Sequence, residues 1–187
     1  MSNKTTLLGM FIFISIISVE AHDGFFLKFS PGFGYVNEYS NNDESGLATP
    51  TKNHAFGWGF NDKYAAFIAD FGSLIKLNKK SGEYDYINLD AFGLGLTYFT
   101  PVKINISVAA AYGMVSFAHS WWEAIGDNKG EGYAMNVSLD KEWALSKRLC
   151  VGLGPHIFFL RTMPPSDYSF LNVSMNLFAV FYFDPMN

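Results

Sequence analysis

The segment FAHSWWEAIG, which contains His119, Ser120 and Glu123, holds the residue types of an ester-cleaving site. A histidine that is oriented by a carboxylate can take the proton of a serine hydroxyl and make that oxygen a nucleophile. Successive residues of a strand point to opposite faces, so His119 and Ser120 converge only if the chain bends there. The chain also lacks the GxSxG motif that presents a serine on a sharp turn. We therefore expect no catalysis, with a lipid-modifying hydrolase or acyltransferase as an alternative.

The sequence offers few features that metal ions or nucleic acids require. Its four histidines, His22, His54, His119 and His156, are scattered without HxH or HExxH spacing. The formal net charge of −4 and the lack of any Lys or Arg run argue against nucleic-acid binding. The single cysteine, Cys150, has no partner for an internal disulfide, and we interpret it as a small strand side chain. We expect no metal, no cofactor and no nucleic-acid partner.

Alternation with a period of two residues dominates the chain. In SFLNVSMNLFAVFYF, residues 169–183, one parity is apolar, while the other includes Asn172, Ser174 and Asn176. This is the period of a β-strand with two unlike faces. The same pattern, punctuated by turn residues, predicts eight strands, at residues 25–39, 54–60, 64–75, 84–99, 104–117, 133–143, 148–161 and 168–183.

The connections between these strands alternate in length. Residues 61–63, 100–103 and 144–147 are short turns, whereas residues 40–53, 76–83 and 118–132 are longer and rich in Gly, Asn and charge. Short turns at one end and long loops at the other are typical of an up-and-down antiparallel barrel in the bacterial outer membrane, with both termini in the periplasm. An even number of strands also lets the sheet close without edges.

The composition and the side chains on the two parities together predict which face of the strands meets water. The chain is 49% hydrophobic and 18% aromatic but only 16% charged, which is rich in apolar residues for a soluble domain. In residues 104–114, Ile106 and Val108 oppose Asn105 and Ser107. Small polar side chains suit the narrow lumen of an eight-stranded barrel, which places the bulky face in lipid. A soluble periplasmic lipocalin-like carrier of an apolar ligand, with the bulky face inside, is the alternative.

This parity predicts two groups of side chains. Charged and polar residues on the inward parity are expected to form a network that closes the lumen, with a porin-like conduction path as the alternative: Lys28, Asp70, Asp90, Asp140, Glu142 and His156. Aromatic residues near the strand ends are expected at the two membrane interfaces: Trp58, Trp121, Trp122, Trp143 and Tyr182.

The N-terminus has the pattern of a secretory signal peptide. Lys4 precedes an apolar run at residues 7–19, and Val19 and Ala21 occupy the positions that a signal peptidase reads. The run is shorter than the roughly 20 residues of a membrane-spanning helix. We expect cleavage after Ala21, which divides the chain into a signal peptide at residues 1–21 and one barrel domain at residues 22–187.

Several segments together resemble a known group. GFFLKFSPGFGYV (24–36), FGLGLTYF (92–99), VGLGPHIFFL (151–160) and the aromatic last strand resemble the small eight-stranded outer-membrane barrels of the OmpX and OmpW kind. The resemblance covers almost all of the mature chain and implies contact with outer-membrane lipid and folding by a barrel-assembly machinery. The terminal aromatic that guides assembly in this group is displaced here, because Phe183 is followed by DPMN.

The long loops hold the remaining functional residues. The loop at residues 118–132, with Trp121 and Trp122 beside Glu123, is the most suited to contact an extracellular ligand, although paired tryptophans also anchor at interfaces. We expect a structural, surface-interaction or small-solute role. The sequence indicates no oligomeric state.

Overall fold

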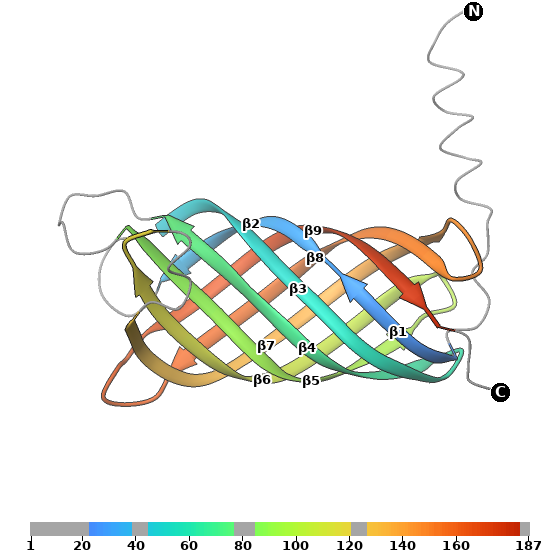
Figure 1. Cartoon of the computed structure of the whole chain (residues 1–187), viewed down its shortest axis with the longest axis horizontal. Helices are drawn as coiled ribbons and strands as arrows, with labels where there is room; N and C mark the ends of the chain where they lie inside the picture. Colours follow the sequence, from blue (N-terminus) through green and yellow to red (C-terminus); the bar gives the residue numbers. More distant parts are fainter. Residues whose placement is uncertain (1–22, 39–44, 77–84, 121–126, 184–187) are drawn as a thin grey trace, which may run out of the picture.

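The computed structural model describes residues 23–38, 45–76, 85–120 and 127–183, and the regular structure in these residues is β-sheet (Figure 1). The strands are β1 (Gly24–Phe29), β2 (Pro31–Glu38), β3 (Ser45–Asn61), β4 (Tyr64–Lys76), β5 (Tyr86–Phe99), β6 (Ile104–Ala118), β7 (Asp127–Ala144), β8 (Leu149–Thr162) and β9 (Ser169–Tyr182). The described residues contain no helix that is long and apolar enough to cross a membrane.

The first two strands together form one strand of the barrel. Both pair with β3 on one side and with β9 on the other. Lys28 lies opposite Ala55 and Pro31 opposite Lys52, so the register continues unchanged across Ser30. The strand is divided into β1 and β2 at Ser30, because the next residue, Pro31, has no N–H to donate to the ladder. Nine assigned strands therefore make an eight-stranded barrel, as the sequence predicted.

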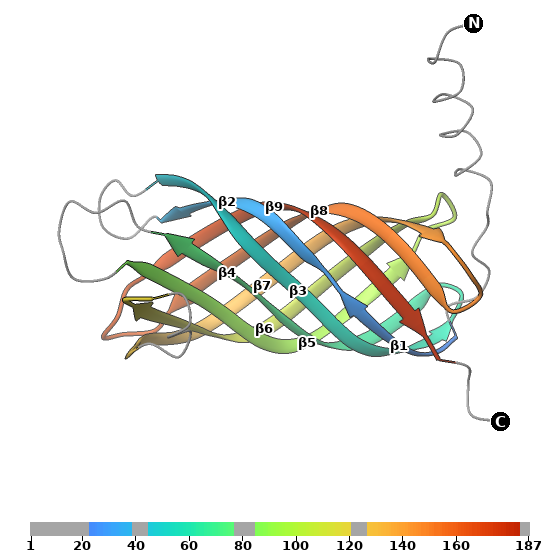
Figure 2. The same ribbon diagram turned by 45° about the horizontal axis from the view of Figure 1, so that its top comes forward.

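The sheet closes on itself. From β3 to β9, each strand pairs antiparallel with the next one in the sequence; β1 and β2 pair with β3 on one side and with β9 on the other, which completes the ring. Figure 2 shows the strands strongly tilted around the barrel. The described strands thus have no unpaired edge, which is the condition for crossing a bilayer with β-structure.

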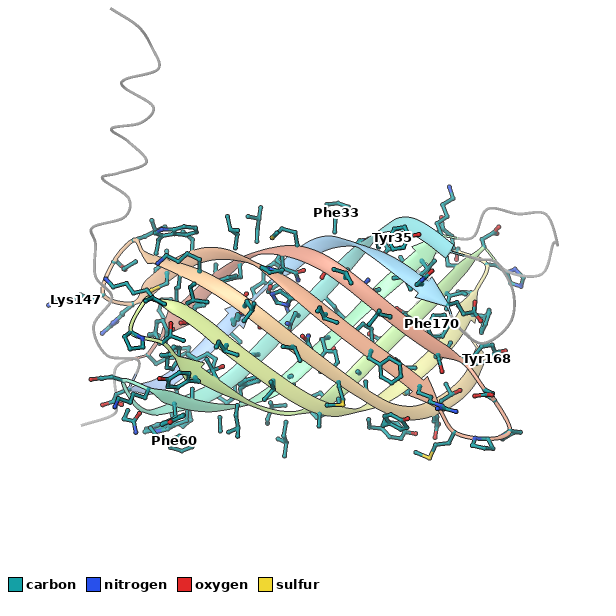
Figure 3. The ribbon with its side chains drawn as sticks, turned by 180° about the vertical axis from the view of Figure 1, so that it is seen from behind. Phe33, Tyr35, Phe60, Lys147, Tyr168 and Phe170 are labelled. Atoms are coloured by element: carbon teal, nitrogen blue, oxygen red, sulfur yellow. The ribbon has the colours of Figure 1, made fainter. Side chains whose placement is uncertain are left out.

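The two ends of the barrel differ. One end of the barrel carries the start of β1, the end of β9 and the short turns at residues 62–63, 100–103 and 145–148. There the backbone N–H of Tyr182 donates to the carbonyl oxygen of Arg148, and that of Phe183 to the carbonyl oxygen of Phe25. At the other end, which we call the loop end, the connection between β8 and β9 is fully described, whereas the other three connections include residues 39–44, 77–84 and 121–126, which lie outside the described residues. Lys147 and Tyr168 lie at these opposite ends (Figure 3).

Two strands are longer than the sequence predicted. β3 begins at Ser45 and not at residue 54, and β7 begins at Asp127 and not at residue 133. Residues 45–53 contain Pro50 and several polar residues that favour a loop. Their ladder with β2, from Ser45 opposite Asn37 to Lys52 opposite Pro31, overrides that local composition. The long loops are correspondingly shorter than predicted.

The bulky face of the strands points outward. Phe33 and Leu94 are each 71% exposed and Leu177 is 66% exposed, whereas their strand neighbours of the opposite parity are half-buried or buried. Figure 3 shows Phe33 and Phe60 projecting away from the barrel wall. This arrangement fits a barrel that is surrounded by lipid. It contradicts the alternative of a soluble carrier, which keeps its apolar face inside.

Candidate functional site

An ion pair lies at the centre of the barrel interior. The Nζ of Lys28 (β1) is 2.6 Å from Oδ2 of Asp140 (β7), whose side chain is 1% exposed. The same carboxylate accepts a hydrogen bond from Ser138 at 2.9 Å and lies 3.0 Å from Nε2 of His156 (β8). Nδ1 of His156 contacts the side-chain amide of Asn53 (β3). Side chains from four strands therefore form one network around the buried carboxylate of Asp140, and Lys28 balances the charge of this carboxylate.

A second polar group lies next to this network, nearer the end with the short turns. Glu142 accepts hydrogen bonds from Asn105 at 2.6 Å and from the hydroxyl of Tyr182 at 2.9 Å. A cavity of about 30 Å³ lies between Glu142 and the Lys28–Asp140 pair. Its size suits a water molecule but not a continuous passage.

Amide and hydroxyl side chains fill the next layer. Asn172 donates to the hydroxyl of Ser73 at 2.8 Å across the barrel. Asn176 accepts from Ser174 at 2.9 Å and donates to the carbonyl oxygen of Ser30 at 3.1 Å. The last bond satisfies a backbone oxygen at the position where the ladder of β1 and β2 is interrupted.

The interior near the loop end is apolar. Phe71 and Phe158 pack edge to face with their centroids 5.3 Å apart. The side chains of this layer that are at most 1% exposed are Phe71, Leu89, Val115, Leu160 and Phe170. These large apolar side chains pack around the hydrogen bond between Asn172 and Ser73, and buried residues fill the interior of the described strands.

The structure places four of the six predicted interior residues inside the barrel. Lys28, Asp140, Glu142 and His156 belong to the two polar groups above. Asn53, Asn105 and Ser138 also belong to them but were not assigned to the network from the sequence, although Asn105 was placed on the small polar face. Asn53 was not predicted in the interior because residues 40–53 were predicted as a loop. If the two-residue period is extended back from residue 54, Asn53 falls on the inward parity.

The prediction that Asp70 and Asp90 face the interior is wrong. Ala69 and Phe71 are the inward residues of β4 and Leu89 and Ala91 those of β5, so both carboxylates lie on the outer wall. Their side chains are 42% and 28% exposed. The error arises because both faces mix apolar and polar residues in these strands.

An outward-facing lysine joins the two carboxylates. The Nζ of Lys52 (β3) lies 2.9 Å from Asp70 and 2.8 Å from Asp90. Gly72 lies directly between Lys52 and Asp90 in the ladder, so no side chain on β4 separates them. A charged residue on the lipid face of a barrel costs about 2–4 kcal/mol near the midplane. We call Lys52, Asp70 and Asp90 the outer-wall cluster. The energetic cost of charges at this position indicates that the cluster has a role.

The predicted interfacial aromatics have different positions. Trp58 is 36% exposed on the outer wall and packs edge to face on Phe25 at 4.3 Å. Trp143 also lies on the outward parity of β7. Tyr182 instead faces the interior and binds Glu142, which contradicts the predicted interfacial role. Trp121 and Trp122 lie outside the described residues.

Neither the candidate ester-cleaving residues nor a metal site is assembled in the part of the chain that the structure describes. His119 is exposed in a bend after β6, and Ser120 follows it, but Glu123 lies outside the described residues. Among the described His, Cys, Asp and Glu residues, no group of three is placed to hold a metal ion.

Comparison with known proteins shows the fold. No family model matches the sequence, and no curated protein matches it. Neisserial surface protein A superposes with a TM-score of 0.59 at 11% identity, covering 87% of this chain and 99% of that one. Ail, the attachment invasion locus protein of Yersinia pestis, in complex with the heparin analogue sucrose octasulfate, gives 0.54 at 10% identity, covering 84% and 99%. The chain thus has the fold of the small bacterial outer-membrane barrels.

The interior ion pair generates a stability prediction. Asp140→Leu leaves the Lys28 ammonium buried without its partner, so we expect a loss of about 3–5 kcal/mol of unfolding free energy. The double variant Lys28→Met/Asp140→Leu removes both charges and should recover part of this loss. Urea unfolding in lipid vesicles, followed by tryptophan fluorescence, measures both values. Lys147→Met in an exposed turn is the control. An Asp140→Leu variant as stable as the wild type would contradict this account.

Proposed function

We propose that this protein is a closed outer-membrane barrel that presents its loops to the environment and acts through them, not through its lumen. The observation that carries the proposal is the filled interior: the Lys28–Asp140 ion pair and the apolar layer around Phe71 occupy the barrel on successive levels. An eight-stranded lumen is normally just wide enough to be filled by side chains. A signal peptide at residues 1–21 and a barrel-assembly machinery would deliver the chain to the membrane.

The described connection at the loop end is well defined. Between β8 and β9, the Thr162 hydroxyl donates to the carbonyl oxygen of Ser166 at 2.9 Å and accepts from the Tyr168 backbone at 2.9 Å. The Met163 backbone donates to Glu131 on β7 at 2.8 Å. Such a loop on a rigid scaffold loses little conformational freedom on binding, which supports a surface-interaction role.

The charge of the loop end favours one class of partner. In residues 38–44, 76–85, 119–131 and 161–167, acidic side chains outnumber basic ones. The acidic residues are Glu38, Asp43, Glu44, Glu83, Asp85, Glu123, Asp127, Glu131 and Asp167, and the basic ones are Lys76, Lys79, Lys80, Lys129 and Arg161. Complementary charge speeds encounter and suppresses wrong partners, so we infer a cationic partner. This balance opposes a polyanionic ligand such as the sucrose octasulfate bound to Ail.

The closed lumen is tested by conductance. We expect the folded protein in a planar lipid bilayer to give no discrete conductance steps, because buried side chains fill each layer of the interior. A general porin reconstituted in parallel shows that the bilayer reports channels. Reproducible steps that increase in number with the amount of folded protein would contradict a closed barrel.

The loop charge is tested by a binding measurement. Proteoliposomes of neutral lipid should bind poly-L-lysine, more weakly as salt increases, and should not bind heparin. Reversing two charges of the connection between β4 and β5 with Glu83→Lys and Asp85→Lys should weaken poly-L-lysine binding about tenfold, since an ion pair at a protein surface contributes up to about 1 kcal/mol. The double change Asp23→Lys with Asp62→Lys, at exposed positions of the other end, is the matched control. Equal weakening by both changes, or heparin binding by the wild type, would refute the inferred partner class.

A further inference from the structure

On β4, the outer-wall cluster lies between apolar residues. Along β4, the outward side chains on either side of Asp70 and Gly72 are Ile68 and Leu74. In the ladder, Asp70 lies between His54 on β3 and the 62% exposed Phe92 on β5. Ionisable residues at such positions are rare in membrane proteins and mark a functional contact.

The cluster concentrates three ionisable side chains on the lipid face. It contains one cation, Lys52, and two carboxylates, Asp70 and Asp90. The amide of Asn88 adds a hydrogen bond to Asp90 from the same strand. Lipid chains supply neither charge nor hydrogen bonds, so a surface of this kind is best covered by polar groups of another protein surface.

The placement of the charges is self-complementary. Lys52 and Asp70 are diagonal neighbours, because Lys52 lies opposite Gly72 and Asp70 lies two residues before Gly72 on β4. The strands are tilted relative to the barrel axis (Figure 1), and a tilt of about 35–45° brings diagonal neighbours of this kind to a similar depth in the membrane. Two copies inserted in the same direction are related by a two-fold axis along the membrane normal, which brings the same patch of each copy together.

We propose that the outer-wall cluster is the contact surface between two copies of this chain in the membrane. A two-fold axis that passes between Lys52 and Asp70 places Lys52 of each copy opposite Asp70 of the other, while Asp90 stays paired with Lys52 of its own copy. The ion pair between Lys52 and Asp90 crosses over Gly72, which is buried beneath it. The exposed apolar residues Ile68, Phe92 and Leu94 surround the charges and become buried.

His54 offers a reporter for this axis. It follows Lys52 on the outward parity of β3 and lies directly opposite Asp70 in the ladder, close to the proposed axis. In a background in which the buried Cys150 is replaced by Ala, a cysteine at His54 should form a disulfide between two copies when proteoliposomes of the purified protein are oxidised. A cysteine at Leu139, which is 45% exposed on the opposite wall on β7, is the matched control.

The charges themselves are tested on the same reporter. We expect the His54→Cys disulfide yield to exceed that of Leu139→Cys by at least about tenfold, and Asp70→Lys to reduce it to the control level because Lys52 then faces a lysine. The exchange Lys52→Asp/Asp70→Lys should restore it when it is made together with Asp90→Asn, which prevents repulsion between Asp90 and the new carboxylate. Asp70→Asn, which adds no charge, should also lower the yield and serves if Asp70→Lys does not fold. Equal yields at the two cysteine positions, or a yield unchanged in every folded Asp70 variant, would overturn the proposal.

Discussion

The structure depends on one constraint: in hydrocarbon, every backbone N–H and C=O must find a partner within the protein. The ring in which β9 returns to β1 and β2 meets this constraint for the described strands. Where Pro31 interrupts the ladder, the carbonyl oxygen of Ser30 accepts from the backbone of Asn53 and from the side chain of Asn176. The closure therefore fixes the register, and the register fixes which side chains face lipid and which face the lumen.

Closure with eight strands also decides the chemistry inside. The interior has room for side chains only, so polar residues there must satisfy one another. Asp140 and Glu142 do so with partners from other strands, and the layer around Phe71 and Phe158 seals the interior toward the loop end. A lumen organised in this way stabilises the barrel. Function then lies with the surfaces that remain, which are the loop end and the outer-wall cluster.

The sequence predicted what strict alternation determines. β9 alternates without interruption, and its ends and inward residues Asn172 and Asn176 lie close to where the pattern placed them. Prediction failed where pairing overrides composition. Lys52 was missed because residues 40–53 favour a loop locally, although their partners on β2 hold them in a strand. Tyr182 was misplaced because an aromatic residue near a strand end suits an interface as well as an interior, and only its bond to Glu142 decides.

The central claim is that the bulky face meets lipid and the opposite face fills a closed interior. It is tested most directly by two single-tryptophan variants on β5, Leu94→Trp on the outer wall and Leu89→Trp in the interior, each with the four native tryptophans replaced by Phe. In vesicles of lipid brominated in the acyl chains, we expect strong quenching of the tryptophan at position 94 and little quenching at position 89. Strong quenching at position 89 with little at position 94 would contradict the assignment of the two faces and, with it, the account of the barrel.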